Sequence, residues 1–316
     1  MSTRALCVVE YGSKMACYSP LHGYKSKVAN PNGKRSLTFS MKSGFKDLQV
    51  TVPCGVCIGC RIDRSRMWAI RCTHEAKMHE ENCFVTLTYD DKYLPENGNL
   101  VKEDFQKFFK RLRKNTGREI RYFACGEYGD QTNRPHYHAI LFGINFSEDR
   151  KKHSEKQGKK YYVSPFLAKT WGLGHALISE FSYSTAAYTA RYVLKKMSGK
   201  LAEEHYQRVN VITGELVQVQ PEFALMSRNP GIGRKWYDKY KKDAFPSDFL
   251  VHEGKKHNVP RYYAEILKQE NEHVYKEVKQ KRINAMNAQK HNSTPDRLHV
   301  RETVKKSQLT QLKRSI

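Results

Sequence analysis

The chain of 316 residues is long enough for one large domain or two ordinary ones with a substantial buried core. Its 56 Lys and Arg residues against 32 Asp and Glu leave a formal charge of +24, which predicts an anionic partner, most commonly nucleic acid. No segment approaches the ~20 apolar residues of a membrane-spanning helix, and the N-terminal MSTRALCVVEYGSKM is too short and polar for a secretory signal. We therefore expect no membrane partner, a cytoplasmic location and reduced thiols at the eight cysteines.

The first 60 residues have few periodic apolar runs but contain five of the eight cysteines. After them, spacing and composition predict a helix, a strand, an amphipathic helix and two more strands, at about residues 62–81, 84–91, 101–114, 120–128 and 136–144. The short loop GDQTNRP between the last two strands predicts an antiparallel hairpin.

The second half of the predicted core begins with a polar insertion at 147–160, which we expect to be mobile. A short helix, a strand and another helix are predicted to follow, at about residues 165–171, 175–181 and 182–196. This order of elements fits an α+β fold, an antiparallel sheet flanked by helices in a ferredoxin-like or RRM-like arrangement.

We expect four parts along the chain: a Cys-rich N-terminal segment, the α+β core, a basic extension, and a polar tail that is helical or disordered, at residues 1–60, 61–200, 201–260 and 261–316. The chain lacks the GxxxxGK[ST] phosphate loop, so we expect no helicase motor within it.

The segment RPHYHAILFG contains a candidate metal site. Residues alternate between the two faces of a strand, so His136 and His138 share a face and can hold one divalent ion. Glu127 ends the preceding strand and would lie almost opposite them in an antiparallel pair. Two histidines and one carboxylate with open positions suit Mg²⁺ or Mn²⁺ bound chiefly by a substrate phosphate. The alternative is a pair of surface histidines satisfied by water.

Tyr188 and Tyr192 are four residues apart and share a face of the last predicted helix. A phenol has a pKa near 10, so its attack on a phosphodiester at neutral pH needs a metal or a cation nearby. Lys195 or Lys196 returns to the same helix face and can hold a phosphate or neutralise charge in the transition state. A chance pair of core tyrosines is the alternative, because the chain has 19 tyrosines.

With these residues in place, the chain resembles the HUH endonucleases that initiate rolling-circle replication, in particular the replication initiators of gokushovirus-like (Microviridae) single-stranded DNA bacteriophages. The resemblance covers most of residues 15–240 and lies in FVTLTYDD, RPHYHAILFG and YTARYVLKK in that order. PCGVCIGCR, MACYSPLHGY and MSRNPGIG are similar to features of this phage group. Tyr137 departs from an aliphatic residue between the histidines, but its ring can still pack against the core.

The resemblance implies a metal-dependent nickase and strand transferase. Its metal ligands correspond to His136, His138 and Glu127, and its nucleophiles to Tyr188 and Tyr192 with the trailing Lys195. It implies cleavage at the origin of duplex replicative-form DNA in the host bacterial cytoplasm and a 5′-phosphotyrosine link. Host polymerase, with a host helicase, would extend the free 3′-OH, and a second transesterification would release single-stranded circles.

Cysteines at 54, 57 and 60 form a CxxCxxC motif, and Cys17 can complete a four-thiolate site. Structural Zn²⁺ is the simplest occupant, and an iron–sulfur cluster is an alternative. A third interpretation is buried thiols without an ion. A metal here would order a segment that has too little apolar content to fold alone.

Basic and aromatic residues interleave in RKWYDKYKK (234–242) and VPRYYAEILK (259–268), a pattern that suits phosphate contact and stacking on unpaired bases. A solvated amphipathic helix face explains either stretch almost as well. The candidate DNA contacts are Lys196, Arg234, Lys235, Trp236 and Lys239.

Two other functions fit parts of this pattern. One is a transposase or plasmid relaxase of the HUH group, against which the short chain, the missing helicase part and the cysteine segment all argue. The other is a non-catalytic RNA- or single-strand-binding protein, which would need aromatic residues rather than histidines at the centre of its sheet.

Overall fold

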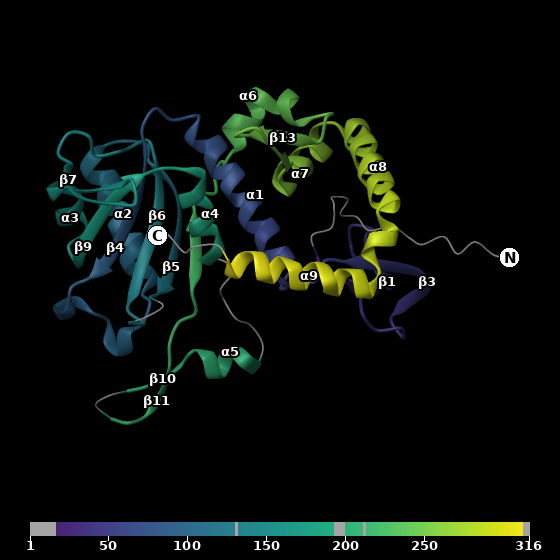
Figure 1. Ribbon diagram of the computed structural model, residues 1–316, viewed down its shortest axis with the longest axis horizontal. Coiled ribbons are helices and arrows are strands. Elements are labelled where there is room, and N and C mark those ends of the chain that lie inside the picture. The colour runs from purple at the N-terminus through teal and green to yellow at the C-terminus, as the bar shows by residue number, and fades with distance from the viewer. Residues whose placement is uncertain (1–16, 130–131, 193–199, 211–212, 312–316) are drawn as a thin grey trace. The chain divides into compact units, whose positions relative to one another are not determined.

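A computed structural model describes residues 17–129, 132–192, 200–210 and 213–311 (Figure 1). The chain divides into unit 1, formed by Met1–Arg64 with Lys242–Ile316, and unit 2, formed by Ser65–Lys241. No helix in the described ranges has both the length and the apolar composition needed to cross a membrane. The segment boundaries near residues 60, 200 and 260 that the sequence suggests stay predictions.

Unit 2 is built on a seven-stranded sheet with antiparallel neighbours, in the order β12-β5-β6-β4-β9-β8-β7. Its strands are β4 (Asn82–Tyr89), β5 (Arg121–Tyr128), β6 (Pro135–Phe142), β7 (Lys151–Lys156), β8 (Lys159–Val163), β9 (Gly174–Glu180) and β12 (Phe223–Met226). The predicted α+β class, a large antiparallel sheet flanked by helices, is confirmed.

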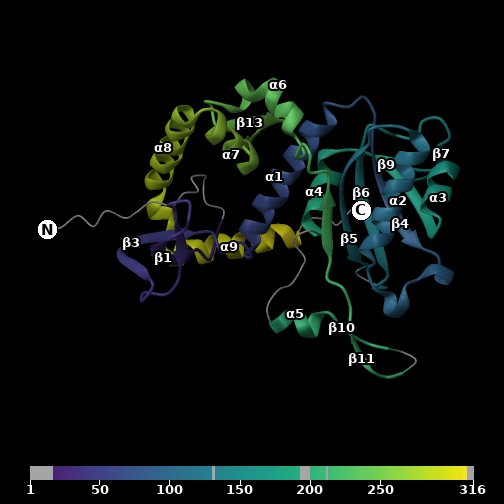
Figure 2. The same ribbon diagram turned by 180° about the vertical axis from the view of Figure 1, so that it is seen from behind.

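Helices cover both faces of this sheet (Figures 1 and 2). Helices α2 (Lys102–Thr116) and α3 (Pro165–Trp171) pack on one face, where the phenylalanines of α2 meet alternate residues of the central strands. Helices α1 (Ile58–Ala76) and α4 (Tyr183–Tyr192) pack on the other face through small residues, chiefly alanines. Tyr137 points to the α2 side, is fully buried, and its hydroxyl donates to the Val101 carbonyl (2.7 Å). The aromatic residue between the histidines is therefore a core residue.

The insertion at 147–160 differs from the prediction. It was expected to be mobile, but it forms the hairpin β7–β8, and β8 pairs with β9 to widen the sheet. Gln157 and Gly158 both have positive φ, 51° and 75°, which is the geometry of a tight two-residue hairpin turn. Polar composition misled the prediction because an edge hairpin can keep most of its side chains in solvent and still satisfy its backbone.

A buried ion pair holds the turn that follows β12. Arg121 of β5 donates to Glu75 of α1 and to the carbonyls of Asn229 and Pro230, and Glu75 accepts the Gly233 N–H (2.6 Å). Both side chains are almost fully buried. The pair therefore joins α1, β5 and the turn of the MSRNPGIG segment in unit 2.

Two smaller pieces complete unit 2: α5 (Lys200–His205) and the hairpin of β10 (Gln207–Val209) with β11 (Leu216–Gln218). The helix α6 (Arg234–Ala244) runs to the end of the unit.

Unit 1 contains the Cys-rich segment and the C-terminal helices. Residues 21–52 form a three-stranded antiparallel sheet, β1 (Leu21–Ala29), β2 (Arg35–Thr38) and β3 (Gly44–Val52). The C-terminal part has the hairpin β13 (Phe249–His252) and β14 (Lys255–Asn258), then α7 (Arg261–Glu270), α8 (Glu272–Ala288) and α9 (Pro295–Thr310). Of the two predictions for the tail, helical or disordered, the described residues are helical.

Candidate metal and tyrosine site

Glu127, His136 and His138 come together on the face of the sheet that α1 and α4 cover. The register of β5 and β6 sets Glu127 opposite His136, as the hairpin predicted. Glu127 Oε1 lies 3.0 Å from His136 Nε2 and 2.8 Å from His138 Nε2. One donor atom from each of the three residues lies within 4.8 Å of the others, so a single ion can contact all three.

Neighbouring groups orient both imidazoles. The Arg134 carbonyl lies 3.1 Å from His136 Nδ1, and Thr86 Oγ1 lies 3.0 Å from His138 Nδ1. When each Nδ1–H donates to its oxygen, each Nε2 lone pair faces the Glu127 carboxylate. Two electron-pair donors that face each other at these distances need a proton or a metal ion between them, which is the arrangement of a metal-ligand pair.

The site is largely closed to solvent, and its electrostatics suit a cation. Burial raises the pKa of Glu127, but hydrogen bonds from His136 and His138 outweigh it and hold the pKa below its usual range. Burial lowers the pKa of His138, which favours the neutral imidazole that binds metals. Glu127 Oε2 is buried and has no hydrogen-bond partner among the described residues. An ionised carboxylate with a buried, unpartnered oxygen fits a divalent cation.

Tyr188 of α4 reaches this group of ligands. Its hydroxyl donates to Glu127 Oε1 at 3.4 Å, and its ring meets the His138 ring edge-on with 5.2 Å between centroids. The ring is partly exposed, unlike the core tyrosines of the sheet. A phosphate bound by the three ligands would therefore lie within reach of the Tyr188 oxygen.

The remaining predicted residues of this site lie at or beyond the end of α4. Tyr192 is the last residue of the helix, and its side chain is not among those described. Lys195 and Lys196 lie outside the described residues. Their roles stay predictions.

The predicted DNA contacts at the start of α6 separate into surface and core residues. Lys235 and Lys239 are exposed, and Arg234 is partly exposed and pairs with Asp238 at 2.8 Å. Trp236 is buried, 4% exposed, and stacks on His74 with 3.4 Å between ring centroids. Its prediction as a base-stacking residue is not supported, because the amphipathic pattern of this helix turns the indole into the core.

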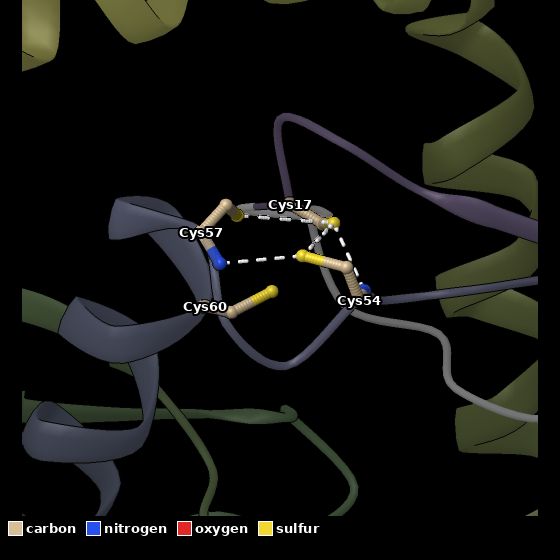
Figure 3. A group of neighbouring side chains, drawn as sticks. All are labelled: Cys17, Cys54, Cys57 and Cys60. Atoms are coloured by element: carbon tan, nitrogen blue, oxygen red, sulfur yellow. Dashed lines mark hydrogen bonds between the residues drawn. The ribbon is translucent and has the colours of Figure 1, made fainter. Parts of the chain in front are cut away.

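The four predicted cysteines also come together, in unit 1. The Sγ atoms of Cys17, Cys54, Cys57 and Cys60 lie within 4.8 Å of one another (Figure 3).

Sequence reasoning missed Thr86 and Arg191. Thr86 lies opposite His138 in the register of β4 and β6, so it was hidden until the pairing of these two strands was known. Arg191 follows Tyr188 by three residues, and its guanidinium carbon lies 5.8 Å from the centre of that ring. The i, i+3 spacing was a usable signal for Arg191.

Thr86→Val should lower the affinity for Mn²⁺ by roughly 10- to 100-fold, because the His138 ring loses the oxygen that fixes its orientation. Thr86→Ser keeps a hydroxyl and should bind Mn²⁺ like the wild type. Isothermal titration with Mn²⁺ measures both variants. Equal affinity of Thr86→Val and the wild type would show that this hydrogen bond does not support the ligands.

Comparison with known proteins identifies the family. The family model for replication-associated protein ORF2 matches residues 82–197, which contain the three ligands and both tyrosines. The chain is 34% identical over 275 residues to replication-associated protein ORF2 of Spiroplasma virus 4, covering 81% of each chain. It is 31% identical over 259 residues to replication-associated protein VP4 of Bdellovibrio phage phiMH2K, covering 78% of each.

A third relative is more distant, and no solved structure matches the chain. Replication-associated protein ORF4 of Chlamydia phage 1 is 29% identical over 244 residues, which are 71% of this chain and 55% of the relative. The extent of the first two matches, with the family model across the ligands and tyrosines, is sufficient: the chain belongs to the ORF2 family of phage replication-associated proteins.

Proposed function

We propose that this protein is a site-specific origin nickase and strand transferase that forms a covalent 5′-phosphotyrosine intermediate and so initiates and terminates rolling-circle replication. The observation that carries the proposal is the 3.4 Å contact between the Tyr188 hydroxyl and Glu127, a carboxylate that also contacts both histidines. A nucleophile and a metal-ligand set on two different elements meet at one point, which a structural tyrosine does not require.

The proposed reaction exchanges one phosphodiester for another. The Tyr188 oxygen attacks the scissile phosphorus, the bond from phosphorus to the 3′ oxygen breaks, and the leaving oxygen takes up a proton to become a free 3′-OH. Attack by a 3′-OH on the phosphotyrosine reverses these steps and rejoins DNA without ATP. Tyr192 serves the second cleavage while the first end stays bound.

The chain's own residues have separate tasks in this reaction. His136, His138 and Glu127 would hold Mg²⁺ or Mn²⁺, which supplies Lewis-acid polarisation of the phosphate. Glu127 also accepts the hydrogen bond of the Tyr188 hydroxyl and so aims its oxygen into the site. Arg191 lies beside the phenol, where its charge favours the phenolate; Lys195 is proposed for the same task.

The proposed substrate is the phage origin, in single-stranded and supercoiled replicative-form DNA. The charge of +24 and the exposed Lys235 and Lys239 suit contact with phosphates, and we assign Arg234 and Lys196 to the same task. The free 3′-OH needs a polymerase and strand separation from the host, so the proposed reaction belongs in the bacterial cytoplasm.

The test uses labelled single-stranded fragments that together cover the phage genome, incubated with the full chain and Mn²⁺. We expect one fragment to give a denaturation-resistant adduct, mapped by mass spectrometry to Tyr188 or Tyr192. The double variant His136→Ala, His138→Ala should form it roughly 10³-fold more slowly, since a metal supplies several kcal/mol of transition-state stabilisation.

His153→Ala is the matched control, because His153 is an exposed histidine of the same sheet and should leave the rate unchanged. Binding of every fragment without any adduct would overturn the proposal in favour of a non-catalytic single-strand-binding protein. An adduct that persists at the wild-type rate in the double variant would overturn the metal assignment.

A further inference from the structure

The four-cysteine cluster of unit 1 has the dimensions of a metal site. Cys17 Sγ lies 3.7 Å from Cys54 Sγ and 3.9 Å from Cys57 Sγ. A disulfide needs ~2.05 Å between sulfurs, whereas four sulfurs at ~2.3 Å around one tetrahedral ion are separated by ~3.8 Å. The Cys60 sulfur points toward the other three from the first turn of α1 (Figure 3). The observed separations therefore match a single ion with four thiolate ligands.

Backbone N–H groups point at the sulfurs, as they do around metal-bound thiolates. The amide nitrogens of Tyr18, Cys54 and Cys57 each lie 3.3 Å from a cysteine sulfur. Gly55 has φ of +78°, a left-handed conformation that turns the chain between Cys54 and Cys57 so that the Cys57 N–H meets the Cys54 sulfur. These donors stabilise negative charge on the sulfurs, a service that neutral buried thiols do not need.

The three-stranded sheet beside the cluster has almost no core of its own. Within residues 21–52, Val50 is the single large apolar side chain that is buried, while Val28, Phe39 and Met41 are each more than half exposed. A sheet with so little apolar burial needs another source of stability. Cys17 shortly precedes β1 and Cys54 shortly follows β3, so the cluster joins the two ends of the sheet to the start of α1.

We propose that Cys17, Cys54, Cys57 and Cys60 bind one structural Zn²⁺ ion that closes the β1–β3 sheet and fixes it to the first turn of α1. The closed set of four protein ligands leaves no open position, so the ion has no catalytic role. An iron–sulfur cluster would place several irons and bridging sulfides between the thiolates, and the sulfurs lie too close together for that. The site is independent of the proposed nuclease site, whose ligands lie in unit 2.

Metal analysis of the purified full chain tests the proposal. Mass spectrometry of the metals should find about one zinc per chain, and Cys54→Ser with Cys57→Ser should lose it. Cys83→Ala removes a buried thiol outside the cluster and should keep the zinc, as should His136→Ala with His138→Ala. Zinc that is lost with the histidines and kept in the cysteine variant would overturn the proposal, as would iron with a visible charge-transfer spectrum.

Two measurements on the wild-type chain hold even if the cysteine variant does not fold. Replacing the ion by Co²⁺ should give the intense visible bands of tetrahedral thiolate coordination, and weak octahedral bands would overturn the proposal. Releasing zinc with a mercurial thiol reagent should speed proteolysis within residues 21–52 about tenfold or more, because the metal contributes folding free energy. Unchanged proteolysis after release would overturn the structural role, whatever the result of the adduct assay.

Discussion

No covalent adduct with DNA should form when Tyr188 and Tyr192 are both replaced by Phe. The Tyr188 hydroxyl is the group that contacts Glu127 in the metal-ligand set, and Phe removes the nucleophilic oxygen while it keeps the ring that meets His138 and Phe84. Loss of a covalent nucleophile lowers such rates by roughly 10⁴-fold or more. Denaturing electrophoresis with labelled origin DNA and Mn²⁺ measures the change.

Tyr183→Phe is the control, since it removes a hydroxyl from the same helix at a position five residues from Tyr188. It should form the adduct at the wild-type rate. Each single variant should retain adduct on the other tyrosine, and mass spectrometry would show which phenol attacks first. An adduct in the double variant at the wild-type rate would mean that another side chain is the nucleophile.

Arg121→Met should lower the free energy of unfolding of the full chain by about 3–5 kcal/mol, the cost of leaving a buried charge without its partner. Arg121 donates to Glu75 and to the carbonyls of Asn229 and Pro230, and its side chain is 3% exposed. Chemical denaturation followed by circular dichroism measures the loss. A change below about 1 kcal/mol would show that the pair is dispensable.

An exposed pair in the same unit provides the control. Arg118 lies 2.8 Å from both Glu81 and Glu148, and its side chain is 44% exposed, so Arg118→Met should cost no more than about 1 kcal/mol. The comparison separates burial of the ion pair from the mere presence of an arginine.

The same ion pair predicts a pH dependence. Burial raises the pKa of Glu75, but hydrogen bonds from His79, Gly233 and Arg121 and the arginine charge outweigh it and hold the pKa below its usual range. The unfolded chain therefore takes up a proton at this carboxyl first as the pH falls. The stabilisation is complete above the usual carboxyl pKa of ~4.3 and is lost as the pH falls through the lower folded value. The difference in unfolding free energy between the wild type and Glu75→Gln should accordingly narrow below pH ~4.

Local rules determined the ligand set and most of the elements around it. Alternation along one strand puts His136 and His138 on the same face, and a short hairpin loop fixes Glu127 opposite them. Helix spacing likewise gave the buried stripe of α2, and close spacing in the chain gave the CxxCxxC segment. Such features depend on residues close in sequence, whose geometry hardly varies between proteins.

Contacts between distant segments decided the rest. Tyr188 joins the site because the alanines of α4 pack on the histidine face of the sheet, 50 residues after His138, and Thr86 joins it because β4 pairs with β6. Trp236 left the surface for the core against His74, and the polar insertion at 147–160 became a sheet edge. The sequence by itself determined which residues can bind metal or attack phosphate and which family the chain resembles. Which of them meet was decided by the tertiary structure, because the face on which a helix packs depends on apolar burial summed over many distant residues.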